Sequence, residues 1–181
     1  MAKETKDYKE DFLNQGFDAT ETAYVQRGFQ LEVVLDVDQV RKFAQTAYEL
    51  GFYLVFVTGF HVRPDEGHDK GNSGLEVVYQ FARYDQLYRI KARVSVPNNL
   101  EVPSISDIYQ GADWHERETR DLYGVVFDGH PNLKPLLLAE EDVDFHPLLK
   151  EEEHLKFLHE VSWSPEPPKA VKGEVESESD Q

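Results

Sequence analysis

The sequence predicts an α+β fold, a two-layer sandwich in which two main helices cover a mixed sheet of about four to five strands. Alternating apolar residues mark the strands, apolar residues at three- and four-residue spacing mark the helices, and one short connection indicates a hairpin. Helices grouped between and after the strands argue against a doubly wound parallel fold. We expect a polar leader at residues 1–24, the α+β domain at 25–138, an irregular C-terminal extension at 139–163 and a disordered acidic tail at 164–181.

The first predicted strand and helix lie between residues 28 and 50. Residues 28–35 alternate apolar and polar side chains, with the period of two that marks a half-buried strand. Asp36 or Asp38 can cap the following helix, and Gly51 can end it. The apolar positions of this helix are Val40, Phe43, Ala44, Ala47 and Leu50. Their spacing predicts a helix that covers one face of the sheet.

Three more strands are predicted before residue 97. Residues 52–57 are apolar on both sides and rich in β-forming residues, which indicates a central strand rather than an edge strand. A polar loop follows at residues 63–74. Residues 75–81 and 88–96 then alternate, and the short connection at 83–86 predicts that they form a hairpin.

A second helix is predicted at residues 104–123, with Ser104 as its cap and Gly124 at its left-handed end. Steps of about 100 degrees per residue place one set of side chains on the core side. This set is Ile105, Ile108, Tyr109, Ala112, Thr119 and Tyr123. Gly111 could break the helix, which would rotate its two halves relative to each other.

The opposite face of this helix combines one large aromatic with charged side chains at spacings that make them neighbours. Its members are Trp114, Arg117, Glu118 and Asp121. A solvated face with ion pairs of a few tenths of a kcal/mol each is one interpretation. A partner surface is the other, because tryptophan and arginine are enriched at interface hot spots.

Glu116 differs from these residues because it projects toward the core side of the same helix. A buried carboxylate requires a partner, and the candidates are Arg120 one turn along or a group in the following loop.

Composition excludes several functional classes. The net charge of −16 disfavours nucleic acid or an anionic lipid surface as a direct partner. The absence of cysteine excludes thiolate nucleophiles, cysteine-ligated zinc and cysteine-held iron–sulfur clusters in this chain. No secretory signal and no run near the roughly 18 apolar residues of a membrane span are recognised. We therefore expect a cytosolic chain, or one attached to a membrane complex through other subunits.

No catalytic, cofactor-binding or metal-binding residues are predicted. Gly129 permits a positive φ and Pro131 favours an extended His130, so this histidine is more often a structural donor than an acid or base. The histidine spacing matches no metal motif, and no nucleophile elbow, phosphate loop or dinucleotide fingerprint occurs. A free-standing acid–base enzyme using Glu116, Glu118 or His130 remains a remote alternative.

Two adjacent runs carry a resemblance to a known family, and they read Glu116-Arg117-Glu118-x-x-Asp121-Leu122-Tyr123-Gly124-Val125 and Phe127-x-Gly129-His130-Pro131-Asn132-Leu133-Lys134. They resemble the signature of the thirty-kilodalton subunit, or C subunit, of NADH:quinone oxidoreductase, respiratory complex I. This family includes counterparts in membrane-bound energy-converting hydrogenases.

The resemblance implies a cofactor-free α+β subunit in the hydrophilic arm of a complex I-like, ion-translocating oxidoreductase, with electrons passing from NADH or ferredoxin to quinone. Such a subunit packs against the large quinone-site subunit and near iron–sulfur subunits, which hold the clusters, on the cytoplasmic side of the membrane. We expect the outward helix face defined above to dock these partners. The remaining motif residues would be structural, and they are Glu116, Tyr123, Gly124, Gly129, His130 and Pro131.

Two departures from the complex I pattern keep the hydrogenase-type complex as the alternative. Arg120 stands where many complex I members have an aromatic residue. A later His-Pro-Leu-Arg-Lys-Asp-Phe segment of the family corresponds here to His146-Pro147-Leu148-Leu149-Lys150-Glu151-Glu152.

Overall fold

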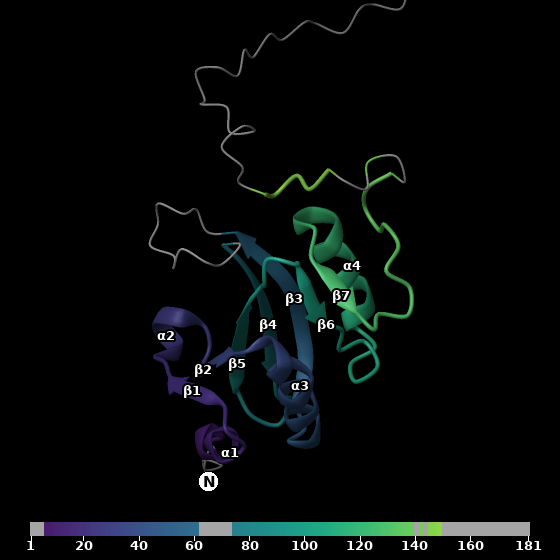
Figure 1. The fold of residues 1–181 in the computed structure, drawn as a ribbon. Coiled ribbons are helices and arrows are strands. Elements are labelled where there is room, and N and C mark those ends of the chain that lie inside the picture. The colour runs from purple at the N-terminus through teal and green to yellow at the C-terminus, as the bar shows by residue number, and fades with distance from the viewer. Residues whose placement is uncertain (1–5, 62–73, 140–141, 143–144, 150–181) are drawn as a thin grey trace, which may run out of the picture. The chain divides into compact units, whose positions relative to one another are not determined.

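A computed structural model describes residues 6–61, 74–139, 142 and 145–149 of the chain. Its main sheet has five strands in the order β1-β2-β5-β4-β3 (Figure 1). β2 and β5 pair in parallel, whereas the other neighbours are antiparallel. The strands are β1 (Asp18–Glu21), β2 (Leu31–Leu35), β3 (Tyr53–His61), β4 (Leu75–Ala82) and β5 (Arg89–Ser95). The predicted α+β class and its mixed sheet are confirmed.

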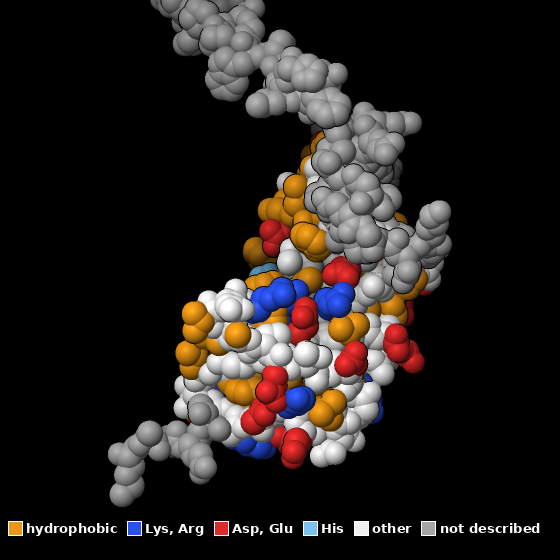
Figure 2. Space-filling view, turned by 90° about the vertical axis from the view of Figure 1, so that its left-hand side faces the viewer, with side chains coloured by type: hydrophobic (Ala, Val, Ile, Leu, Met, Phe, Trp, Pro, Cys, Tyr) orange, Lys and Arg blue, Asp and Glu red, His pale blue; other side chains and the backbone are white. Residues whose placement is uncertain are grey.

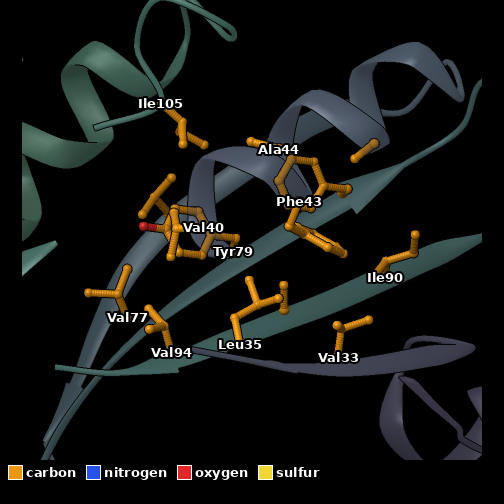
Figure 3. Close-up of a cluster of buried hydrophobic side chains, with 14 of the residues drawn as sticks. Val33, Leu35, Val40, Phe43, Ala44, Val77, Tyr79, Ile90, Val94 and Ile105 are labelled. Carbon is orange, nitrogen blue, oxygen red and sulfur yellow. The ribbon is translucent and has the colours of Figure 1, made fainter. Parts of the chain in front are cut away.

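The core lies between one sheet face and helix α3 (Val40–Glu49), which follows a short 3-10 turn, η1 (Val37–Gln39). Phe43 of this helix lies over the side chains of β2, β4 and β5 (Figure 3). The backbone N–H of Asp36 donates to Gln39 Oε1 at 3.1 Å, as in a capping box, and Gly51 follows the helix with φ +80°. The predicted helix, its start and its stop are therefore confirmed.

The predicted hairpin also forms, since β4 and β5 pair in antiparallel register from Glu76 opposite Ser95 to Ala82 opposite Arg89. The other sheet face carries ion pairs that join Glu32 to Lys91 and Glu76 to Arg93. Figure 2 views the molecule from the left-hand side of Figure 1, and acidic and basic side chains are interspersed among the described residues visible there. That view shows no broad basic patch of the kind that nucleic acid binding requires.

The prediction of a polar leader over residues 1–24 is wrong. This segment contains helix α1 (Lys9–Asn14), strand β1 and the first residue of the short helix α2 (Tyr24–Arg27). The Phe12 ring is fully buried and lies 5.1 Å from that of Phe43, between centroids. Apolar residues separated by charged ones face inward here, because the charges occupy the exposed side of α1. The first predicted strand is also shorter, since Gly28 ends α2 in the left-handed region at φ +81°.

The prediction that residues 52–57 form a central strand is wrong as well. β3 is longer than predicted and lies at the edge of the sheet, where it pairs with β4 alone among the described strands. The apolar residues of β3 are therefore not explained by burial on both faces. Val57 faces the core and Gly59 faces helix α4. Val55 and Phe60 are exposed. The predicted loop at residues 63–74 lies almost entirely outside the described residues.

The second predicted helix is real but shorter. α4 (Ala112–Tyr123) begins directly after Gly111 and ends at Gly124, which has φ +76°. Residues 104–111 form turns instead, in which the Ile105 carbonyl accepts from the Tyr109 N–H at 2.9 Å. Two short strands that were not predicted flank this region, β6 (Glu101–Pro103) and β7 (Val126–Asp128), and they pair in parallel. Beyond residue 149, the predicted extension and acidic tail lie outside the described residues.

Candidate partner-docking site

Helix α4 lies directly against the backbone of β3. A Cβ atom added to Gly59 would lie 2.4 Å from Cδ2 of Tyr123, well inside van der Waals contact. Only glycine allows the two elements to approach this closely. The motif residue Tyr123 therefore has a packing role at the end of α4.

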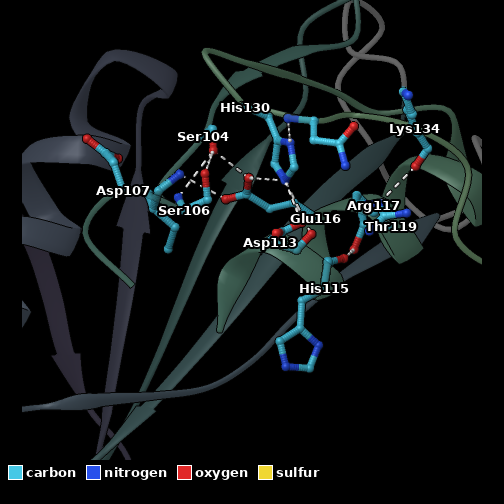
Figure 4. Close-up of polar contacts among 12 residues, drawn as sticks. Ser104, Ser106, Asp107, Asp113, His115, Glu116, Arg117, Thr119, His130 and Lys134 are labelled. Atoms are coloured by element: carbon cyan, nitrogen blue, oxygen red, sulfur yellow. Dashed lines mark hydrogen bonds and ion pairs between the residues drawn. The ribbon is translucent and has the colours of Figure 1, made fainter. Parts of the chain in front are cut away.

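The inward side of α4 carries a buried carboxylate, Glu116, whose exposed fraction is 0%. The Ser104 hydroxyl donates to Glu116 Oε2 at 2.6 Å, and the Ile105 N–H donates to Oε1 at 2.8 Å (Figure 4). Ser106 Oγ lies 2.9 Å from Ser104 Oγ and extends this network. Arg120, the partner suggested from helical spacing, instead contacts Asp121 at 3.2 Å. Glu116 thus joins α4 to the turn that follows β6.

Burial raises the pKa of Glu116 to about 7, because the charged form loses its hydration. The hydrogen bonds from Ser104 and Ile105 oppose this rise, while the nearby carboxylates of Asp107 and Asp113 add to it. The carboxyl group therefore keeps its proton to a higher pH than an exposed glutamate does.

His130 lies in the turn after β7 with its side chain fully buried. Its Nδ1 accepts the backbone N–H of Asn132 at 3.0 Å, so the ring proton belongs on Nε2. Nε2 lies 3.3 Å from the Asp113 carbonyl and 3.9 Å from Glu116 Oε2. Gly129 has φ +80°, as the turn motif predicts. The side chain holds this turn against the start of α4 and has no exposed surface for a substrate.

Asp121 was predicted to lie on the outward face, and this prediction is wrong because the side chain is buried. Its Oδ2 accepts three consecutive backbone N–H groups, from Leu136 at 2.7 Å, Leu137 at 2.8 Å and Leu138 at 3.2 Å. Burial raises the pKa of this carboxyl, but the donors from these amides and Arg120 outweigh it, so the pKa is lowered. Asp121 is therefore a charged anchor for the segment after the turn.

The Arg117 side chain donates hydrogen bonds to backbone carbonyl groups of the same segment. Its Nε donates to the Lys134 oxygen at 3.0 Å (Figure 4). Its Nη2 donates to the Pro135 oxygen, also at 3.0 Å. We call residues 134–138 the strap. The cation of Arg117 thus contacts strap carbonyls, and the anion of Asp121 contacts strap amides. These two predicted docking residues contact the chain's own backbone.

Exposed surface in this region comes from other side chains. Trp114 is 66% exposed and Leu137, in the strap, is 60% exposed. Glu118 is partly exposed. Of the predicted outward face, Trp114 is the most exposed residue.

Residues 145–149 pack against the C-terminal end of α4. The helical pattern did not predict this contact. His146 Nδ1 lies 3.0 Å from the Asp121 carbonyl oxygen, and the Leu148 N–H donates to the Leu122 carbonyl at 3.1 Å. A Cβ atom added to Gly124 would lie 2.8 Å from the His146 ring. Gly124 therefore both ends the helix and admits His146. The family's His-Pro-Leu run was the available sequence signal for this contact.

No group of three or more His, Cys, Asp or Glu side chains in the described ranges could hold a metal ion. Within those same ranges, no helix has the length and apolar composition needed to cross a membrane.

These packing contacts can be compared with known proteins. The family model described as "Respiratory-chain NADH dehydrogenase, 30 Kd subunit" matches residues 33–157, more than half of the chain. The chain belongs to this family. The match includes α4, the turn at His130 and the strap, so the contacts described above lie within the family region.

Curated relatives carry the name of the C subunit of NADH-quinone oxidoreductase. The protein of Mesorhizobium japonicum is 46% identical over 77 residues, 42% of this chain and 38% of the relative. That of Bartonella bacilliformis is 40% identical over 77 residues, 42% of this chain and 37% of the relative. These matches therefore span little more than a third of the length of the relatives.

Two solved structures share the fold. A trypsin-resistant fragment of Nqo5 has a TM-score of 0.58 and 26% identity, covering 68% of this chain and 95% of the fragment. A chain of the membrane-bound sulfane sulfur reductase, an archaeal respiratory membrane complex, has a TM-score of 0.63 and 22% identity, covering 76% of this chain and 79% of that chain. The second likeness concerns the fold alone.

Proposed function

We propose that this chain is a cofactor-free structural subunit in the hydrophilic arm of a complex I-like, ion-translocating oxidoreductase that passes electrons from NADH or ferredoxin to quinone. The observation that carries the proposal is that the family's charged motif residues bind the backbone of their own chain. Glu116, Arg117 and Asp121 each bind backbone groups of their own chain, so the motif shapes a surface. Their use fits a subunit that acts by holding other subunits in place.

The partners in this proposal are the large quinone-site subunit and the iron–sulfur subunits, which hold the clusters. The chain would be peripheral, on the cytoplasmic side of the membrane, and attached through these subunits. Helix α4 and the strap supply the docking surface, with Trp114 as an aromatic contact. Arg117 and Asp121 contribute by fixing the strap, and Glu118 lies partly exposed on the same helix.

Purification of the tagged full chain from solubilised membranes tests the proposal. We expect the large subunit and iron–sulfur subunits to be recovered with it, together with protein-bound iron. Recovery of the chain without either kind of subunit would refute the proposal. Nickel in the recovered complex would identify the hydrogenase-type alternative, whereas flavin and NADH oxidation would identify the complex I type.

The free-standing enzyme has less support. Glu116 and His130 have buried side chains, and both are engaged with neighbouring backbone or hydroxyl groups, so a substrate has no access to them. Activity of the purified chain that disappears in His130→Ala, with the fold retained, would favour this alternative.

A further inference from the structure

A groove of about 380 Å³ lies along β6 and the turn that precedes it. The apolar residues that line it are Val37, Pro97 and Pro103, and the polar ones are Asn99, Glu101 and Asp128. Among the residues that the structure describes, neither a lysine nor an arginine lines this groove. The groove therefore combines apolar surface with two carboxylates and has no described cation of this chain beside them.

The two carboxylates lie on one face of the β6–β7 pair. Val102 and Phe127 are opposite each other and buried, so the residues on either side of them in each strand point outward. Asp128 is opposite Pro103, two residues along β6 from Glu101, which makes the two acids diagonal neighbours. Both are exposed. Among the ion pairs of the described residues, none involves either carboxylate.

The backbone of β6 offers no N–H group on the side away from β7. A parallel ladder directs alternate residues to the neighbouring strand, and the Ser104 N–H donates to the Asp128 carbonyl at 2.8 Å. Glu101 and Pro103 therefore direct their backbone groups to the other side. The Glu101 N–H donates to Asn99 Oδ1 at 3.3 Å, and proline has no N–H. An added partner strand, which needs both donors and acceptors, would be poorly paired here.

We propose that this groove binds an arginine side chain of a neighbouring subunit, with its guanidinium group between Glu101 and Asp128 and its aliphatic stem against the proline rings. A guanidinium group has five donors and no acceptor, which matches two carboxylates beside a strand edge without donors. It is also planar and more weakly hydrated than a lysine ammonium group, so it packs well on apolar surface. This inference rests on the proposed function, because the arginine belongs to a partner subunit.

The first experiment tests the groove without any partner. Isotope-labelled full chain is titrated with an acetylated and amidated glycine-arginine-glycine tripeptide, and with the same peptide carrying uncharged citrulline in place of arginine. We expect the arginine peptide to shift the NMR signals of the Asn99, Glu101 and Asp128 amides. It should bind about fivefold more tightly than the citrulline peptide, as two weak surface ion pairs allow. Equal affinity of the two peptides, or shifts confined to other residues, overturns the inference.

The second experiment tests the partner, using the full tagged chain co-expressed with the large and iron–sulfur subunits of its complex. Glu101→Lys combined with Asp128→Lys reverses both charges of the groove. Glu10→Lys combined with Glu49→Lys is the matched control, because these exposed acids on α1 and α3 do not line the groove. We expect the first pair to lower the recovery of large subunit and iron by about tenfold or more, since like charges would then face each other. The control pair should change neither quantity.

The outcomes separate the inference from the function on which it rests. Equal recovery with the two pairs of substitutions, whether both are normal or both are reduced, overturns the binding of a partner arginine and leaves the structural subunit intact. If the unchanged chain recovers no partner subunit, the proposed function itself fails. The peptide comparison uses the unchanged chain, so it still decides the role of the groove if a variant melts at a lower temperature.

Discussion

Replacement of Glu116 by glutamine should change how the stability of this protein depends on pH. Glutamine keeps the shape of the side chain and cannot ionise. In the native protein the carboxyl group is buried, with Ser104 and Ile105 as donors. The ionisable groups that interact with it include Arg41, Tyr79, Asp107, Asp113 and His130. Because burial penalises the charged form, the folded protein binds a proton here more tightly than the unfolded chain does.

The magnitude follows from the shift in pKa from 4.5 to about 7. Each pKa unit corresponds to about 1.4 kcal/mol, so this shift corresponds to about 3 kcal/mol of unfolding free energy. The folded pKa is the higher one, so the stabilising contribution is fully present below pH 4.5 and is lost as the pH rises through about 7. Titration of Glu116 therefore lowers the unfolding free energy as the pH rises from 4.5 through about 7.

Urea unfolding of both proteins between pH 4.5 and 8.5 measures the effect. The unfolding free energy of the native chain minus that of Glu116→Gln should fall by about 3 kcal/mol across this range. Taking the difference removes the pH dependence contributed by the titratable groups that both proteins share. Glu10→Gln, at an exposed position, controls for the removal of one negative charge. A difference that stays constant with pH would refute the assignment of Glu116 as a buried, proton-binding group.

Three further changes test the contacts of α4. Asp121→Asn leaves the strap amides with a neutral acceptor, and we expect urea unfolding to show a loss of about 2–4 kcal/mol; unchanged stability would contradict the three-amide contact. Gly59→Ala should cost about 1–3 kcal/mol by forcing a methyl group into Tyr123. Gly111→Ala is its control, since a Cβ there meets nothing within 4 Å, and equal effects would disprove the close approach. Trp114→Ala should reduce assembly with partner subunits while changing the unfolding free energy by less than about 0.5 kcal/mol.

Elements that depend on local sequence were predictable. The α3 helix was found from its apolar spacing, its start from Asp36 and its end from Gly51. The β4–β5 hairpin followed from alternation on both sides of a short connection, and the end of α4 followed from Gly124. In each case the determining residues lie within a few positions of the structure they specify.

Contacts between distant segments were not predictable in the same way. Helical spacing places Asp121 opposite the core side, and this would leave it in solvent if the chain ended at Gly124. The strap returns across that face about 15 residues later and covers it, which no periodicity of α4 reveals. The position of β3 in the sheet could not be predicted from its sequence either. An apolar run is expected for a central strand and equally for an edge strand that a helix covers, as α4 covers β3.

The charged side chains of the α4 motif are used to bind groups of their own chain. A catalytic or metal-binding group needs at least one free lone pair or proton directed at accessible space. Here the carboxylate of Glu116 faces Ser104 and Ile105, and that of Asp121 faces the strap amides. Arg117 faces the strap carbonyls. Because backbone groups have the same chemistry at every position, these contacts constrain the path of the strap and leave its side chains free to vary. The charged motif can therefore fix the path of the strap backbone whatever side chains the strap presents.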